Sequence, residues 1–288
     1  MFEAVVHGIF LLLGLITVGC VLLITVYLII SGIPAIQKIG LVPFLTGKVW
    51  SSTSAEPKYG ILPFILTSVY GTAGAIVLGV PVGFLTAVYL SKVAPKKVRT
   101  VLEAAVSLLA GIPSVVYGLV GMLVLVPAIR KTFHLPDGAS LFAAIIVLAV
   151  MILPTMTTLS VDGLRAVPDS YRQGSLALGY TRWQTIWHVV LKSAMPSLMT
   201  AVILGMTRAF GETLAVRMVI GGIEAMPTSL LSPASTITTT LTTSMAVYAE
   251  GSAQDDVLWA LGLLLMGMSL IFILIIHLIG RKGAKARG

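Results

Sequence analysis

The stretch Met206-Thr-Arg-Ala-Phe-Gly-Glu-Thr-Leu-Ala-Val216 decides how this chain folds, because it places two charges inside an apolar segment of residues 193–223. At membrane depth a single charge costs roughly 2.5–3.5 kcal/mol. Arg208 and Glu212 are four residues apart, so they share one face of a continuous helix. Charged residues at this depth usually face a protein interior or a water-filled path, which makes the pair the first functional candidate.

The composition places the whole chain in a membrane. Of its 288 residues, 57% are hydrophobic and only 10% are charged, whereas soluble domains carry about 25% charged residues. The single cysteine, Cys20, excludes a disulfide within the chain. We therefore predict an all-α integral membrane protein.

Six uncharged or nearly uncharged segments are long enough to cross a bilayer, which needs roughly 20 apolar residues. This pattern places Arg208 near the middle of the fifth predicted helix. Residues 224–256 are crowded with serine and threonine, so we expect there a short outer helix or a re-entrant piece packed in protein. The six predicted transmembrane helices lie near residues 8–30, 64–90, 106–129, 140–161, 195–222 and 257–280.

The distribution of lysine and arginine predicts the orientation of the chain. If the N-terminus is inside, the inner segments hold twelve of the 19 cations and the outer segments hold five. Cytoplasmic segments carry such an excess, so both termini are predicted to be cytoplasmic, including a basic tail at 282–288. The net charge of +8 is then explained by topology and by contact with membrane lipid headgroups, with no indication of nucleic acid.

The inner loop of residues 162–192 is predicted to contain a short helix. Pro168 is typical of a helix start, and Gly179 is typical of a helix end. The helix between them would expose Tyr171, Leu176 and Leu178, and exposed apolar side chains need a partner surface. An amphipathic helix lying on lipid is the alternative interpretation.

This loop resembles the coupling loop of ATP-binding-cassette (ABC) importer permeases, whose pattern is Glu-Ala-Ala, three residues, Gly, nine residues, Ile, one residue and Leu-Pro. Gly179 and Leu191 match that pattern and Val189 is a conservative change. Gln173-Gly-Ser175 replaces Glu-Ala-Ala, and Lys192 replaces the proline. The resemblance implies the type I permease fold with a cytoplasmic coupling helix. The residues expected to couple to an ATPase are Pro168, Tyr171, Gln173, Gly174, Ser175, Leu176 and Gly179.

Three further stretches are similar to the phosphate-importer permeases of the PstC type. Permeases of the sibling PstA type tend to have a proline after Gly-Glu-Thr, where this chain continues with Leu214. The similarity covers roughly residues 40–280, and Arg217 departs from the apolar residue that is usual there. The stretches are Leu109-Ala-Gly-Ile-Pro-Ser-Val-Val-Tyr-Gly118, Arg208-Ala-Phe-Gly-Glu-Thr-Leu-Ala-Val216 and Tyr59-Gly-Ile-Leu-Pro63.

The resemblance also implies the domains and the partners. The chain would consist of an N-terminal helix with an outer loop (1–58), a permease domain (59–281) and the basic tail. Its expected partners in a bacterial or archaeal plasma membrane are a sibling permease of the PstA type, two ATPase subunits that bind ATP and Mg²⁺, and an external phosphate-binding protein. Inorganic phosphate is the expected cargo.

Two absences limit what the chain itself does. It contains no Gly-x-x-x-x-Gly-Lys-Ser/Thr phosphate loop, so ATP hydrolysis is expected on a partner and the chain is not expected to be an enzyme. Its four histidines show no metal-ligand spacing, and no cofactor is expected.

Phosphate transport requires a cation in the path that compensates the charge of the oxyanion. Arginine stays protonated and binds phosphate oxygens with a planar fork. Arg208 is therefore expected to meet the anion, and Glu212 is expected to neutralise Arg208 when no anion is present. A structural ion pair without substrate contact is the alternative. Thr213 and Ser114 complete the predicted substrate path.

Ser114 follows Pro113, and a proline kinks a transmembrane helix by removing a backbone hydrogen bond. We expect the serine hydroxyl to satisfy the backbone groups that are freed; ordinary packing through small residues is the alternative. Arg217 falls on the side of a continuous helix opposite to Arg208, and it is expected to snorkel toward the outer end.

Two other classes of transporter remain. A sulfate or molybdate importer would share the loop and the topology, and the Arg-Ala-Phe-Gly-Glu-Thr stretch favours phosphate over these. An ATP-independent secondary transporter or channel needs no coupling loop, so residues 162–192 argue against it.

Overall fold

Within the described part of the chain, six helical segments are long and apolar enough to cross a membrane. The computed structural model describes residues 2–52, 54, 56–245, 247 and 253–285. The prediction of an all-α membrane protein with six spans is confirmed. The candidate spans are Val6–Ile39, Leu62–Val93, Ser114–Phe133, Leu141–Arg165, Arg182–Gly211 and Gln254–Ile275.

The chain divides into two compact units, residues 1–62 with 241–268 and residues 63–240 with 269–288. The expected division into 1–58, 59–281 and 282–288 stays a prediction, and residues 286–288 of the tail lie outside the described residues. The first unit is formed by α1 (Phe2–Ile39), α2 (Leu41–Thr46), the strands β1 (Trp50–Ser51) and β2 (Lys58–Tyr59), the second half of α12 (Ile237–Met245) and the first half of α13 (Ala253–Lys285).

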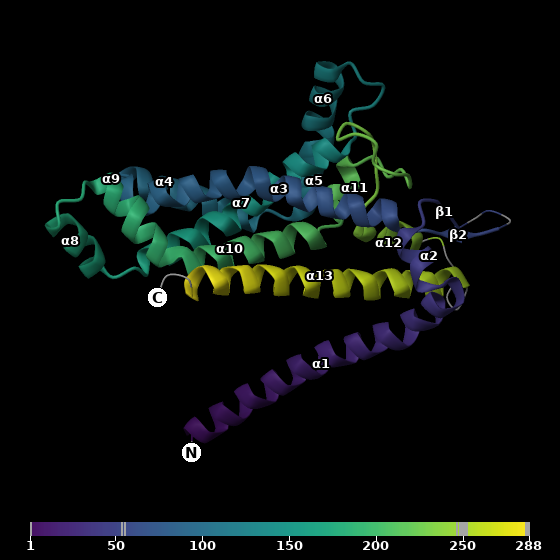
Figure 1. Ribbon diagram of the computed structural model, residues 1–288, viewed down its shortest axis with the longest axis horizontal. Helices are drawn as coiled ribbons and strands as arrows, with labels where there is room; N and C mark the ends of the chain where they lie inside the picture. Colours follow the sequence, from purple (N-terminus) through teal and green to yellow (C-terminus); the bar gives the residue numbers. More distant parts are fainter. Residues whose placement is uncertain (1, 53, 55, 246, 248–252, 286–288) are drawn as a thin grey trace. The chain divides into compact units, whose positions relative to one another are not determined.

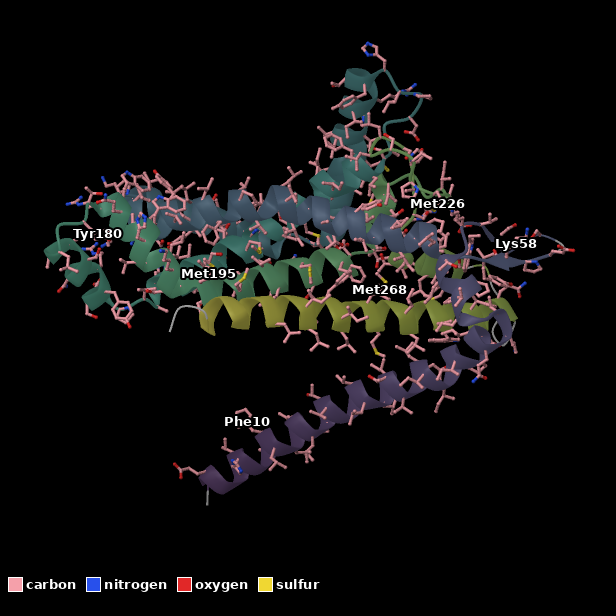
Figure 2. All side chains as sticks on the ribbon, viewed as in Figure 1. Phe10, Lys58, Tyr180, Met195, Met226 and Met268 are labelled. Atoms are coloured by element: carbon pink, nitrogen blue, oxygen red, sulfur yellow. The ribbon has the colours of Figure 1, made fainter. Side chains whose placement is uncertain are left out.

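In the first unit, contacts join the C-terminal half of α1 to the start of α13. The edge of the Tyr27 ring meets Trp259, with 5.0 Å between the ring centroids. The Lys38 ammonium lies 3.3 Å from the Asp256 carboxylate. The most apolar part of α1 is not buried, and Phe10 projects outward from it with 70% of its surface exposed (Figure 2).

The second unit holds the remaining helices, several of which are interrupted. Figure 1 shows α8 and α9 at one end of the bundle that α7 and α10 form, and α6 at the other end. The helices are α3 (Leu62–Val88), α4 (Lys96–Gly111), α5 (Ser114–Val120), α6 (Val126–Phe133), α7 (Leu141–Arg165), α8 (Asp169–Ala177), α9 (Arg182–Thr185), α10 (Leu191–Gly211) and α11 (Leu214–Val219), with π-helical turns η1 (Tyr89–Val93), η2 (Gly121–Leu125) and η3 (Ile186–Val190).

Helix α7 is the centre of the second unit, and 67% of its most apolar stretch is buried. Glycines on both neighbouring helices let backbones approach it closely. A Cβ atom at Gly79 of α3 would lie 2.8 Å from the Ile152 side chain, and one at Gly205 of α10 would lie 2.5 Å from the Met156 sulfur. Small residues at helix interfaces are a general means of packing in membranes, where the solvent is as apolar as the side chains.

The third span starts later than predicted. It begins at Ser114, not near residue 106, because α4 ends at Gly111 and the next two residues are extended. Pro113 explains the break, since proline disfavours a helical conformation of the residue before it and donates no backbone hydrogen bond.

The fifth span is also displaced, and this changes the position of Arg208. The span runs from Arg182 to Gly211, not from 195 to 222. Cations at the inner end do not terminate the helix, because long basic side chains keep their charged groups in water. Glu212 is extended, with ψ at 132°. Arg208 therefore lies in the last turn of α10 and not in the middle of a continuous helix.

Candidate functional site

The predicted charge pair lies at a break between two helices. Glu212 separates α10 from α11, and its Oε1 accepts a hydrogen bond of 3.1 Å from the Ala215 backbone N–H in the first turn of α11. A carboxylate at a helix N-terminus is favourable, because the first N–H groups have no partner within the helix. Glu212 thus stabilises the start of α11.

Arg208 is bound to another helix and not to Glu212. Its Nη1 donates a hydrogen bond of 2.9 Å to the Thr155 hydroxyl of α7. The described residues Arg208 and Glu212 form no ion pair with each other, and each has another partner. In this conformation the break turns the two side chains to different partners; the neutralisation of Arg208 by Glu212 stays a prediction.

A second break faces the first. The Tyr117 hydroxyl donates a hydrogen bond of 2.8 Å to the Leu109 carbonyl, across the interruption between α4 and α5. Ser114 is half-buried at the first position of α5, and its hydroxyl forms no hydrogen bond with any described residue. Tyr117, and not Ser114, therefore satisfies a backbone group that the break frees. Sequence analysis missed Tyr117, although it lies within the quoted stretch 109–118.

The two short helices that follow the breaks pack against each other. A Cβ atom at Gly118 of α5 would lie 2.8 Å from the Ala215 Cα and 2.9 Å from the Met218 sulfur of α11. Discontinuous helices at membrane depth are where transporters place charged ligands, because exposed backbone groups and helix ends are then available in the interior. The breaks at Pro113 and Glu212 thus define the candidate site.

Buried hydroxyl groups surround the Glu212 side of the site. The Thr238 hydroxyl donates to the Glu212 carbonyl at 3.0 Å, and the Ser68 hydroxyl accepts from the Ile237 N–H at 3.0 Å. A cavity of about 10 Å³ separates these groups, which is space for about one water molecule. The serine- and threonine-rich segment therefore forms a short helix packed in protein at its start, and it contributes to the site.

The other predicted residues lie nearby but have local partners. The Thr213 hydroxyl donates to the Gly211 carbonyl at 3.4 Å, within the same break. Arg217 is exposed on α11, and its guanidinium occupies the space where a side chain at Gly222 would lie. Partial burial raises the pKa of the nearby Glu224 carboxyl, and the charge of Arg217 opposes that rise.

Helix α8 occupies the segment predicted to be helical. Pro168 precedes it, and Gly179 follows it with φ at +85°, a conformation that favours glycine. The buried Ser175 hydroxyl lies 3.0 Å from the Thr185 hydroxyl, which fastens α8 to α9. Tyr171, Gln173, Gly174 and Leu176 are exposed. The helix itself is confirmed, while its coupling to an ATPase stays a prediction.

The site has hydrogen-bond donors that suit an oxyanion. Within the described residues, no group of three or more His, Cys, Asp or Glu side chains is placed to hold a metal ion. The hydrogen bond to Thr155 uses one of the five N–H donors of the Arg208 guanidinium. No other hydrogen bond of this guanidinium reaches a described residue, so its remaining donors are available to a ligand.

Relatives of the chain show the family to which it belongs. Residues 79–284 match the family described as the binding-protein-dependent transport system inner membrane component. A probable ABC transporter permease protein of Bacillus subtilis, YqgH, is 44% identical over 271 residues, which cover 93% of this chain and 88% of that protein. A phosphate transport system permease protein PstC of Mesorhizobium japonicum is 34% identical over 251 residues, covering 81% of this chain and 76% of that protein.

A solved structure shares the fold. A chain in the crystal structure of a bacterial alginate ABC transporter, in complex with a periplasmic protein bound to an alginate pentasaccharide, matches with a TM-score of 0.65 and 15% identity. The match covers 98% of this chain and 97% of that one. The similarity to PstC-type permeases and the importer permease fold are thus confirmed, and the chain belongs to the family of binding-protein-dependent transport system inner membrane components, as a permease subunit of an ABC importer.

Proposed function

We propose that this chain is one of the two permease subunits of an ATP-driven importer of inorganic phosphate. Support comes from the similarity to a PstC protein, whose name states phosphate transport. The Bacillus relative is described only as a probable ABC transporter permease, so the cargo must also be argued from the site.

The observation that carries the proposal is the available Arg208 guanidinium at the α10–α11 break. Its permanent charge compensates that of the anion, and its planar fork fits two phosphate oxygens. Glu212 bonds to the start of α11 and leaves this cation unneutralised. Ser114 and Thr213 lie at the first residues after the two breaks and offer hydroxyls along the path.

In this proposal, the path is closed at the level of Glu212 in this conformation. The cavity there holds about 10 Å³, which is too small for a phosphate ion. For phosphate to pass beside Glu212, the helices at the two breaks would then have to separate. The close contact of Gly118 with Ala215 is the part of the structure that has to open.

The covalent connections from α8 explain how an ATPase would drive this opening. Helix α8 is joined through α9 and η3 to α10, and the far end of α10 carries Arg208. Movement of α8 on an ATPase that binds ATP and Mg²⁺ would shift α10 against α7, where Thr155 holds the arginine. Pro168, Tyr171, Gln173, Gly174, Ser175, Leu176 and Gly179 would form or support the coupling surface.

The complete importer in this proposal contains partners that the family requires. A sibling permease of the PstA type supplies the other half of the path, two ATPase subunits bind at the α8 end, and an external protein delivers phosphate. Both termini are then cytoplasmic, and the complex lies in the plasma membrane of a bacterium or archaeon, in agreement with the excess of cations in the inner segments.

Reconstitution of the complex in vesicles tests the cargo. Uptake of labelled phosphate is measured with and without the ATPase and the binding protein, in parallel with sulfate and molybdate. We expect uptake of phosphate only, and only with both partners and ATP. Preferential uptake of sulfate or molybdate would assign a related oxyanion importer, and uptake without the ATPase would assign a secondary transporter.

A further inference from the structure

A basic pocket lies beside α8, outside the proposed substrate path. It has a volume of about 260 Å³, and we call it the α8 pocket. It lies where η1 at the end of α3, the helix α8, and α9 with η3 meet. Its lining residues are Lys92, Arg172, Leu176, Arg182, Thr185, Ile186 and Val190.

The charge of the α8 pocket is strongly unbalanced. Three of its lining residues are cations, and none is acidic. Asp169 interacts with Lys92 and lies 4.0 Å from Arg172, so it offsets one of the three charges. Arg165 and Arg99 add repulsion on Lys92. Cations held this close repel one another, and an anion that binds between them relieves the repulsion.

The donors of the α8 pocket suit the oxygens of a phosphate group. Two guanidinium groups offer planar forks, and the Lys92 ammonium offers a third cationic donor. Thr185 adds a hydroxyl, which is already positioned by its contact with Ser175. A tetrahedral anion presents oxygens in several directions, and these donors come from three different elements of the chain.

The α8 pocket lies at the level of lipid headgroups and has an apolar side next to its cations. Lys92 lies at the end of the second span and Arg182 at the start of the fifth, which is the depth of lipid headgroups. Leu176, Ile186 and Val190 form an apolar wall beside the cations. Basic pockets between membrane helices on the cytoplasmic side bind lipid headgroups.

We propose that the α8 pocket is a binding site for a phosphate group, carried by an anionic phospholipid or present as free inorganic phosphate. The ligand bridges the end of α3 to α8 and thereby holds α8 against the bundle. Occupancy then sets how freely α8 moves. The proposal does not depend on the cargo of the transporter, since none of its residues lies in the proposed path.

The test uses the assembled complex in discs of phosphatidylcholine. One arm titrates short-chain phosphatidylglycerol, and the other titrates inorganic phosphate; binding is followed by the melting temperature and by native mass spectrometry. The pocket variant is Lys92→Gln with Arg182→Gln, which leaves α8 unchanged. The control, Lys97→Gln with Lys192→Gln, removes two exposed cations from the same inner segments but outside the pocket.

We expect the apparent Kd of at least one ligand to rise on the order of tenfold or more in the pocket variant, and by less than about twofold in the control. Binding of phosphatidylglycerol alone identifies the lipid as the source, and binding of inorganic phosphate identifies the free ion. Equal losses in both variants would show general surface attraction and overturn the proposal. If neither phosphatidylglycerol nor inorganic phosphate binds to the wild-type complex, the proposal is also overturned.

A second measurement uses the unaltered chain in case the pocket variant does not assemble. A photoreactive phosphatidylglycerol and a photoreactive aryl phosphate are each crosslinked to the wild-type complex, and the labelled peptides are mapped. Labels at residues 172–190 support the site. Labels only elsewhere, or labels at the pocket only when the ATPase has been removed, would contradict it, the latter because the ATPase would then be the occupant.

Discussion

The Thr155 hydroxyl of α7 accepts a hydrogen bond of 2.9 Å from the Arg208 guanidinium of α10, so a neutral partner positions this part-buried arginine. A neutral acceptor orients the cation without cancelling its charge. An anion in the path then encounters the full charge, which a carboxylate partner would have reduced.

Arg208→Gln is expected to reduce phosphate uptake on the order of tenfold or more, because hydrogen bonds to a charged group contribute about 1.5–3 kcal/mol. Uptake of labelled phosphate is measured at matched membrane levels. Arg217→Gln is the control, since it removes an exposed arginine from the next helix. If the Arg208 variant transports phosphate at the wild-type rate, the arginine is structural.

Thr155→Val is expected to reduce uptake roughly fivefold, because it removes one hydrogen bond worth about 1 kcal/mol and leaves the arginine charged. Thr155→Ser keeps the hydroxyl and should restore uptake. The rate is compared at low and saturating phosphate. Wild-type uptake by the valine variant would show that the hydroxyl bond to Arg208 is not needed.

Tyr117→Phe is expected to lower the free energy of unfolding by about 1 kcal/mol, since the Leu109 carbonyl at the α4–α5 break loses its partner. Thermal unfolding in detergent measures the effect. Tyr70→Phe is a matched control, because Tyr70 is exposed on α3. Identical melting of the two variants would contradict the role of the phenol at the break.

Gly118→Ala is expected to destabilise the fold by about 1–3 kcal/mol, because the added methyl group meets the α11 backbone. It should also slow uptake, since α5 and α11 no longer close fully. Gly111→Ala is the control: a Cβ atom there meets no atom within 4 Å. Comparable losses in the two alanine variants would contradict the role of this contact, because alanine by itself favours a helix over glycine.

Gly179→Val is expected to uncouple the complex. Its φ of +85° is costly for a side chain by about 1–2 kcal/mol, and the space around it is open, so the strain falls on the end of α8. We expect phosphate-dependent ATP turnover to fall while the chain still assembles with the ATPase, as shown by pull-down. Unchanged turnover would count against α8 as the coupling helix.

The spans could be predicted because continuous apolar sequence dominates the free energy of a helix in lipid. The helix breaks could be predicted only in part. Pro113 indicated a kink by its chemistry, but the apolar residues before it concealed that α4 is a separate helix. The spacing of four residues also suggested that Arg208 and Glu212 share one helix face. This is true only of a continuous helix, and the helix ends at Gly211.

The break at Glu212 had a weaker signal. Gly211 is a residue type that ends helices, and Thr213 is a type that starts them, yet both are also common inside membrane helices. The partners of Arg208 and Tyr117 come from residues 53 and eight positions away in the sequence. The first contact depends on the packing of α10 on α7 and the second on the turn between α4 and α5, so neither can be read from the local pattern.

The exposure of α1 has a consequence for biogenesis. An apolar helix left bare in water would drive aggregation, but hydrocarbon solvates it as well as protein does, so a newly inserted chain is stable in the bilayer before it meets another subunit. The hydrophobic effect does not drive association within the bilayer. Another subunit that covers α1 therefore binds only if its side chains pack against the helix more closely than lipid chains do.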